Sequence, residues 1–145
     1  MANNINNIMN TQAQITGQKI TNQCTDITYP QVSGLKDKNV QNSINELIRK
    51  KVDWQIPREG CAVYAEIFGE YEVMLNQKDL LSINLQFYTI RKQAANGLDV
   101  QKSVNVDLLT GKDYQLYELF KRGSNYRMTI DKMIEEQIRE KIYIS

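Results

Sequence analysis

The clearest pattern in the chain is an alternation of apolar and polar side chains from residue 61 to residue 75. A period of two residues puts every second side chain on one face of a β-strand, so this segment is predicted to be a strand with one buried face. A strand of this length is expected to bend or bulge, and Gly69 is the expected place. The apolar set lies at odd positions: Cys61, Val63, Ala65, Ile67, Gly69, Tyr71, Val73 and Leu75.

The same alternation recurs over residues 81–88 and 98–108 and predicts two further strands. The turn before the last strand contains Asn96-Gly97, which suits positive φ. Three consecutive strands joined by short turns form an antiparallel β-meander. Odd-numbered side chains of the first two strands and even-numbered ones of the third are expected to point inward, although Lys102 interrupts the last apolar set.

Two other segments repeat apolar side chains every three or four residues, which predicts amphipathic helices. The first runs from Lys38 to Val52, and Asp37 can cap its free amides. The second follows Ser124, after a short helical turn at residues 116–120. The apolar stripe of the first helix is Val40, Ile44, Leu47, Ile48 and Val52, and that of the second is Tyr126, Ile130, Met133, Ile134, Ile138 and Ile142.

These elements predict an α+β fold in which an antiparallel β-meander has two long helices packed on one face. Residues 14–28 are rich in Thr, Ile and Gln and are expected to form one weakly patterned strand, ended by Pro30 and Gly34. The asparagine-rich residues 1–13 are expected to be a frayed or disordered end. The chain is therefore interpreted as a single domain over residues 14–145.

Length and charge exclude several kinds of protein. A chain of 145 residues is one domain that can bury a real core. Its 18 basic and 17 acidic side chains leave a net charge of +1, which argues against a general nucleic-acid binder. No apolar run approaches the roughly 20 residues of a membrane helix. The first residues lack the features of a signal peptide, so the protein is either cytosolic or its signal or anchor is absent from this chain.

The two cysteines, Cys24 and Cys61, have the spacing of neither a zinc site nor a CxxC redox pair. Two interpretations stay open. They are two small buried thiols, or they form a single disulfide between neighbouring strands of an exported protein. A nucleophilic cysteine is not expected, because the chain has no histidine to activate it.

The protein is predicted not to be an enzyme, and no metal or cofactor is expected. The lack of histidine removes the commonest general base and every histidine-based triad. Gly111-Lys112-Asp113 lacks the remainder of a phosphate-binding loop. Glu66, Glu70 and Glu72 share one side of one strand, which is typical of a solvated surface and not of two opposed glycosidase carboxylates.

Aromatic side chains on the polar face of the predicted sheet suggest a binding surface. The alternation places Tyr64, Phe68 and Tyr88 on that face, beside Glu66 and Gln86. Aromatic residues among polar ones are typical of recognition surfaces. The candidate binding residues are therefore Tyr64, Glu66, Phe68 and Tyr88. The alternative is that another segment or a second copy of the chain covers them.

Several short segments occur in an order that is characteristic of a known domain. They are Tyr29-Pro30-Gln31-Val32-Ser33-Gly34-Leu35, Val40-Gln41-Asn42-Ser43-Ile44-Asn45, residues 81–88, residues 104–112, and residues 116–120 with the helix after Ser124. In these segments the chain resembles, from Tyr29 to Ile142, the extracellular domain shared by lysozyme-sensing anti-sigma factors and the N-terminal region of some Gram-positive peptidoglycan deacetylases.

The resemblance implies an α+β fold, a binding role and a location in the cell envelope or outside the cell. The family's glycine- and histidine-containing turn is here Gln93-Ala94-Ala95-Asn96-Gly97, so no role of that histidine applies. The family tends to continue into further strands, whereas this chain ends at Ser145, so it is either a short version or lacks C-terminal strands. The catalytic module of the deacetylases has no counterpart, and deacetylase activity is not implied.

The predicted function is a non-catalytic extracellular binding or sensory domain of the bacterial cell envelope, with a protein such as lysozyme or a cell-wall glycan as ligand. The alternative is a structural or assembly protein that forms an oligomer through its open sheet face. Neither a nucleic-acid partner nor a membrane span is expected in this chain.

Overall fold

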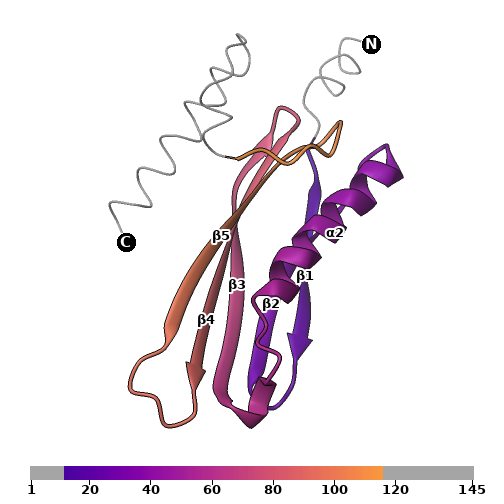
Figure 1. The fold of residues 1–145 in the computed structure, drawn as a ribbon. Helices are drawn as coiled ribbons and strands as arrows, with labels where there is room; N and C mark the ends of the chain where they lie inside the picture. Colours follow the sequence, from indigo (N-terminus) through magenta and orange to yellow (C-terminus); the bar gives the residue numbers. More distant parts are fainter. Residues whose placement is uncertain (1–11, 116–145) are drawn as a thin grey trace, which may run out of the picture.

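The computed structural model describes residues 12–115. The elements in chain order are β1 (Gln14–Thr21), β2 (Thr25–Ser33), α2 (Lys38–Trp54), the short 3-10 helix η1 (Gly60–Ala62), β3 (Tyr64–Gln77), β4 (Leu80–Arg91) and β5 (Leu98–Asp107). The strands form one five-stranded sheet in the order β1-β2-β3-β4-β5. Helix α2 runs obliquely across one face of this sheet (Figure 1). We call the face toward α2 the inner face and the opposite one the outer face.

The predicted fold class is wrong. The described residues form a mainly β structure, a mixed five-stranded sheet with a single α-helix, and not a meander beneath two long helices. Strands β3, β4 and β5 pair antiparallel, but β2 joins the sheet as a parallel neighbour of β3. Helix α2 is the crossover that two parallel strands require. The second predicted helix, the helical turn at residues 116–120 and residues 1–11 of the predicted frayed end lie outside the described residues.

The segment predicted as one strand is a hairpin of β1 and β2, turned by Asn22. The side-chain oxygen of Asn22 accepts hydrogen bonds from the backbone N–H groups of Cys24 and Thr25, at 3.1 and 2.8 Å. A turn closed by an asparagine side chain needs neither glycine nor proline, so the usual turn residues are missing from it. For this reason the sequence predicted one continuous strand where the structure has two.

Pro30 was expected to end a strand but lies inside β2, opposite Gly17. Proline is tolerated where only one side of a strand is paired. Strand β2 pairs with β3 only over Thr25–Ile27, so position 30 has no neighbour strand on that side. Further along, Asn45 of α2 bonds the strand instead, because its side chain accepts from the Val32 N–H at 2.7 Å and donates to the Val32 carbonyl at 2.9 Å.

Helix α2 confirms the first predicted helix. The carboxylate of Asp37 caps it by accepting hydrogen bonds from the backbone N–H groups of Asn39 and Val40. Each of its core side chains contributes roughly 1.5–3 kcal/mol by leaving water. The fully buried side chains of the helix are Ile44, Ile48 and Val52. No helix within residues 12–115 is long and apolar enough to cross a membrane.

Strand β3 contains two irregularities, and neither is at Gly69. The pairing with β4 skips one residue between Tyr64 and Glu66 and another between Val73 and Leu75. Each extra residue reverses the alternation beyond it. The predicted inward set of odd positions therefore holds only in the middle of β3, whereas Tyr64 faces inward and Leu75 faces outward.

Gly69 permits close packing of three strands. It lies opposite Phe87 of β4 and beside Ile27 of β2. A Cβ atom at this position would lie 3.0 Å from Cγ2 of Ile27 and 3.1 Å from Cδ1 of Phe87. A larger residue would therefore push the neighbouring side chains apart.

The core lies between α2 and the inner face. A disulfide links the two ends of the crossover connection between β2 and β3. Cys24, just before β2, is bonded to Cys61 in η1, with a sequence separation of 37 residues. The carbonyl of Cys24 also accepts a hydrogen bond from the N–H of Ile67 at 2.8 Å. The crosslink thus holds the start of β2 against the start of β3. The fully buried core side chains include Ile27, Val32, Ile67, Leu81, Ile83, Leu85 and Val104.

Candidate binding surfaces

An aromatic pair lies in the middle of a strip across the outer face. Phe68 of β3 is directly opposite Tyr88 of β4. Asp26 of β2 lies beside Phe68, and Asp99 of β5 lies beside Tyr88. Both rings are half-buried, and both carboxylates are exposed. We call these four residues the aromatic strip.

The outer face around the aromatic strip is acidic. The neighbouring rows of β3 add Glu66, Glu70 and Glu72, all exposed. A basic residue on this face, Lys19, is already paired, because its Nζ lies 3.1 Å from a carboxylate oxygen of Asp26. That ion pair is exposed and contributes at most about 1 kcal/mol. The face therefore presents aromatic rings among negative charges.

Tyr88 also fixes the loop between β4 and β5. A Cβ atom at Gly97 would lie 2.5 Å from Cε1, Cζ and the hydroxyl oxygen of Tyr88, so this side chain covers the glycine directly. Contact with the loop backbone restricts the rotamers of Tyr88. A side chain that is already ordered loses less entropy when a partner binds it.

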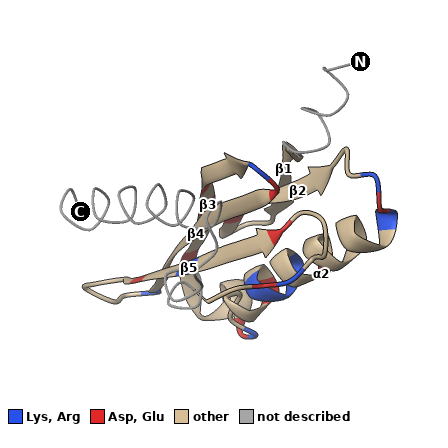
Figure 2. Cartoon of the chain, turned by 90° about the horizontal axis from the view of Figure 1, so that it is seen from above, with Lys and Arg blue, Asp and Glu red and all other residues tan. Residues whose placement is uncertain are grey.

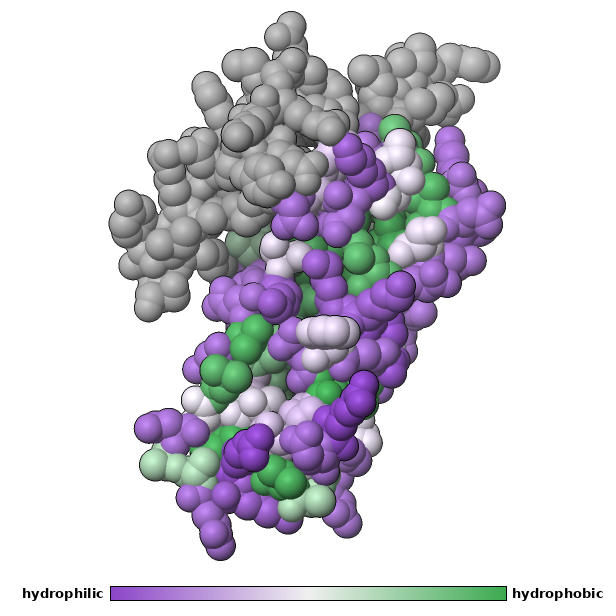
Figure 3. All heavy atoms as spheres, viewed as in Figure 1, coloured by the Kyte–Doolittle hydropathy of each residue, from purple (hydrophilic) through white to green (hydrophobic). Residues whose placement is uncertain are grey.

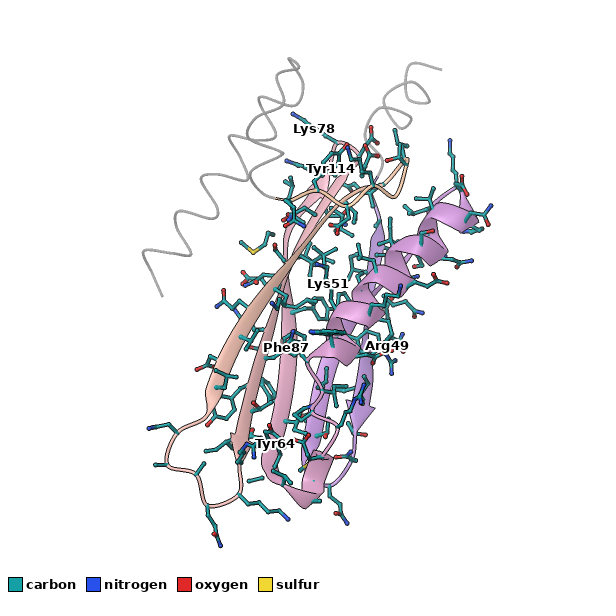
Figure 4. All side chains as sticks on the ribbon, viewed as in Figure 1. Arg49, Lys51, Tyr64, Lys78, Phe87 and Tyr114 are labelled. Atoms are coloured by element: carbon teal, nitrogen blue, oxygen red, sulfur yellow. A yellow bond between two sulfur atoms is a disulfide. The ribbon has the colours of Figure 1, made fainter. Side chains whose placement is uncertain are left out.

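The structure does not bring Tyr64 together with the other three predicted binding residues. The bulge at Ala65 turns Tyr64 to the inner face, where it pairs with Arg91. The guanidinium carbon of Arg91 lies 5.3 Å from the centre of the Tyr64 ring, a cation–π distance. Figure 4 shows Tyr64 at the end of the sheet where β3 begins. Glu66, Phe68 and Tyr88 do share the outer face, as predicted from the alternation.

A second surface opens on the inner face, where α2 ends before it reaches β5. Trp54, the last residue of α2, is 86% exposed. A hollow of about 290 Å³ separates this end of the helix from β4 and β5. Figure 3 shows hydrophobic residues reaching the surface among polar ones on this side of the molecule. The apolar residues of the lining are Trp54, Ile56, Pro57, Tyr64, Phe87, Leu98 and Val100.

The adjoining hollow, of about 310 Å³, is strongly basic. It is lined by Lys50, Lys51, Trp54, Gln55 and Lys102. Lys50 and Lys51 precede Trp54 by four and three residues, so all three lie on one side of the helix. Lys102 belongs to β5 and lies opposite the buried Leu85, on the inner face. Figure 2 shows basic residues along α2, and Figure 4 places Lys51 between the helix and the strands. We call the two hollows together the lysine groove.

Arg49, the residue before Lys50, is engaged within the fold. Its Nε donates to a carboxylate oxygen of Asp53 at 2.8 Å, and its Nη1 donates to the Tyr29 hydroxyl at 2.8 Å. The hydrogen bond to Asp53 raises the pKa of Arg49, so the guanidinium stays charged. The two ion pairs found within the described residues involve Arg49 and Lys19, and neither involves Lys50, Lys51 or Lys102.

Within residues 12–115, no group of three or more His, Cys, Asp or Glu side chains is arranged to hold a metal ion. The carboxylates of the outer face lie in a flat row and not around a cleft.

The lysine groove is missing from the sequence-based candidates. Two signals pointed to it, because Lys102 interrupts an apolar set and Trp54 lies just beyond the apolar stripe of the helix. Lys102 and Trp54 come close together because α2 runs obliquely over the sheet, and no local sequence pattern predicts that path.

No protein-family profile matches the chain. The anti-sigma-V factor RsiV of Bacillus subtilis (strain 168) is 27% identical over 123 residues, which cover 81% of this chain and 42% of that protein. The chain therefore spans less than half the length of this relative. The match supports the resemblance to anti-sigma factors, whereas the link to peptidoglycan deacetylases is not shown.

Two solved structures are similar to the chain. A DUF3298 family member from Bacteroides fragilis NCTC 9343 has a TM-score of 0.52 and 13% identity, covering 74% of this chain and 61% of that one. A DUF3298 family protein from Pseudomonas aeruginosa PAO1 has a TM-score of 0.41 and 13% identity, covering 75% and 56%. The first shows a shared fold. By sequence and by fold, then, the chain is similar to an anti-sigma factor and to a DUF3298 domain.

Proposed function

We propose that this chain is a non-catalytic sensory domain of a bacterial envelope protein of the anti-sigma type, and that its outer face binds a cationic protein such as a lysozyme. The similarity to RsiV supports the anti-sigma part of the proposal. The disulfide between Cys24 and Cys61 supports a location outside the cytoplasm, because such bonds persist in oxidising compartments.

The observation behind the choice of ligand is the aromatic strip in its acidic surroundings. Phe68 and Tyr88 offer a paired apolar contact, and Asp26 and Asp99 flank it. Carboxylates around an aromatic centre attract a basic partner and set its orientation. A cell-wall glycan with negative charges would be repelled by the same carboxylates. A cationic protein is therefore the better match among the two predicted ligands.

The charge of the outer face also argues against the assembly alternative. In a two-fold dimer through this face, Glu66, Glu70 and Asp99 of one copy would approach the same acidic patch of the other copy. Like charges brought together at an interface oppose association.

Binding of purified lysozyme to the full chain, measured by calorimetry, tests the proposal. Phe68→Ala removes one ring of the strip and is expected to weaken binding about tenfold or more. Glu66→Lys with Glu70→Lys is expected to slow association and to reduce the salt dependence of the affinity. Tyr64→Ala is the matched control, because it removes an aromatic ring of β3 from the inner face and is expected to leave the affinity unchanged.

Three results would overturn the proposal. The first is no binding of lysozyme by the unmodified chain at low salt, with retention of peptidoglycan fragments. The second is an equal loss of affinity in Phe68→Ala and Tyr64→Ala. The third is a stable dimer in light scattering that Phe68→Ala converts to a monomer, because the outer face would then be an assembly surface.

A further inference from the structure

We propose that the lysine groove is a docking site for an acidic peptide segment that inserts one large apolar side chain. This site lies on the face opposite the aromatic strip and does not depend on the proposed function. It uses different residues and the opposite charge.

The first argument is the convergence of three lysines on one hollow. Lys50 and Lys51 come from α2 and Lys102 comes from β5, and all three line the same space of about 310 Å³. Like charges gathered in this way oppose one another. Helix stability alone explains part of this lysine cluster, because the helix dipole favours a cation in the last turn of a helix. It applies to Lys51 but not to Lys102, which replaces an apolar side chain on the inner face of a strand.

The second argument is the hollow beside the lysines, whose lining mixes large apolar side chains with the polar Gln55, Glu59 and Thr89. Trp54 borders both hollows and is 86% exposed, and Leu98 at the far rim is 62% exposed. Large apolar side chains left in water beside a charged rim are typical of interaction sites. An exposed tryptophan in particular is the kind of residue that dominates binding energy.

The third argument is the match of size and chemistry with one kind of occupant. The hollow beside the lysines, of about 290 Å³, is at the lower limit of the volumes that hold whole small ligands. It therefore suits a single large side chain of a longer chain molecule. The adjacent lysines then need carboxylates on neighbouring residues, which an acidic peptide supplies. An anionic polysaccharide would satisfy the lysines but would leave the lining of Phe87, Val100 and Ile56 without an apolar partner.

Trp54 offers a direct test, because it is the only tryptophan of the chain. The probe is a synthetic peptide with four acidic residues around one leucine and one phenylalanine, titrated into the full chain. Docking is expected to bury the indole and to shift its fluorescence emission to shorter wavelength. Replacing Lys50, Lys51 and Lys102 by glutamate is expected to weaken binding about tenfold or more.

Two controls separate docking from general attraction. Replacing Lys36, Lys78 and Lys92 by glutamate changes the net charge equally at exposed positions that do not line the groove, and is expected to preserve the peptide affinity. A peptide whose leucine and phenylalanine are replaced by serine is expected to lose both affinity and emission shift. Thermal unfolding of each variant checks that it is folded.

The proposal is overturned if both triple variants lose affinity equally, or if the serine peptide binds as well as the apolar one. It is also overturned if poly-glutamate or dextran sulfate gives the same emission shift at lower concentration, because the site would then recognise a polyanion. Lysozyme binding is expected to persist in the Lys50, Lys51 and Lys102 variant. The two binding surfaces can therefore succeed or fail separately.

Discussion

The two faces of the sheet use the same strands and have opposite chemistry. The outer face places Phe68 and Tyr88 among carboxylates, whereas the inner face ends in a groove where Trp54 lies among lysines. A net charge of +1 therefore describes neither surface. It says nothing about the separation of opposite charges between two faces of a sheet. Charge has to be assigned to a face before it predicts a partner.

The difference between the two faces has a simple structural origin. Strands β4 and β5 alternate strictly, so each adjacent pair of residues supplies one side chain to each face. Tyr88 and Phe87 are neighbours in sequence, yet Tyr88 belongs to the aromatic strip and Phe87 to the lysine groove. Changes at single positions can thus affect one surface and spare the other.

Removal of the disulfide is expected to lower the free energy of unfolding more than any other change and to impair both faces of the sheet. Cys24→Ala with Cys61→Ala opens a loop of 37 residues, and the chain-entropy relation gives a loss of about 4 kcal/mol. Both surfaces are expected to fail together, because the crosslink holds β2 to the start of β3. Urea unfolding followed by circular dichroism of the sheet measures the loss. A change below about 1 kcal/mol would contradict this account.

Gly69→Val is expected to have the next largest effect and to act on one face more than the other. The new side chain would press on Ile27 and Phe87, at a cost of about 1–3 kcal/mol. Because Phe87 lines the lysine groove, peptide docking is expected to weaken more than lysozyme binding. Gln101→Val, at an exposed strand position of β5, is the control and is expected to leave stability nearly unchanged. Equal weakening of both ligands would mean that the faces are not independent.

Deletion of Ala65 tests why Tyr64 lies on the inner face. Without the bulged residue, Tyr64 directly precedes Glu66, and regular alternation keeps it inward against Arg91. The expected cost in unfolding free energy is about 1 kcal/mol, as for a modest single change. Nuclear Overhauser contacts between the Tyr64 ring and the Arg91 side chain are expected to persist. Contacts of Tyr64 with Phe68 in the unmodified chain that give way to contacts with Arg91 in the deletion variant would contradict the assigned bulge.

Lys102→Val is expected to have the smallest effect on stability, with a gain of about 0.2–1 kcal/mol from an apolar pair with Leu85. Acidic-peptide binding is expected to fall even though the fold improves, which separates binding from stability. Light scattering is measured alongside, because an inward charge on an edge strand also discourages strand-to-strand association. Lys92→Val, in the loop before β5, is the control. A loss of stability in Lys102→Val would mean that this lysine supports the fold.

The sequence predicted the regular parts of the fold and missed its irregular ones. Asp37 and the apolar stripe identified α2, and strict alternation identified the paired part of β3, β4 and β5. The β1–β2 hairpin was missed because Asn22 closes the turn with its side chain. The parallel pairing of β2 was missed because Pro30 suggested the end of a strand, and nothing local shows that β2 has a free side there.

The candidate site was predicted in part for the same reason. Glu66, Phe68 and Tyr88 share a face because the alternation between them is regular. Tyr64 does not, because one extra residue at position 65 reverses the alternation and alanine gives no signal for a bulge. The lysine groove depends on where α2 crosses the sheet, which is a property of tertiary packing.

Strands β2 and β3 pair only over Thr25–Ile27. This short parallel pairing is the junction between the antiparallel pair β1–β2 and the antiparallel strands β3, β4 and β5. The aromatic strip crosses this junction, with Asp26 on one side and Phe68 on the other. A partner that binds both residues would link the two sides of the junction and would stabilise the intact sheet by mass action. Binding of a ligand to the outer face would thereby make the whole domain more rigid. Such a change in rigidity is one physical way in which a domain can sense a bound ligand.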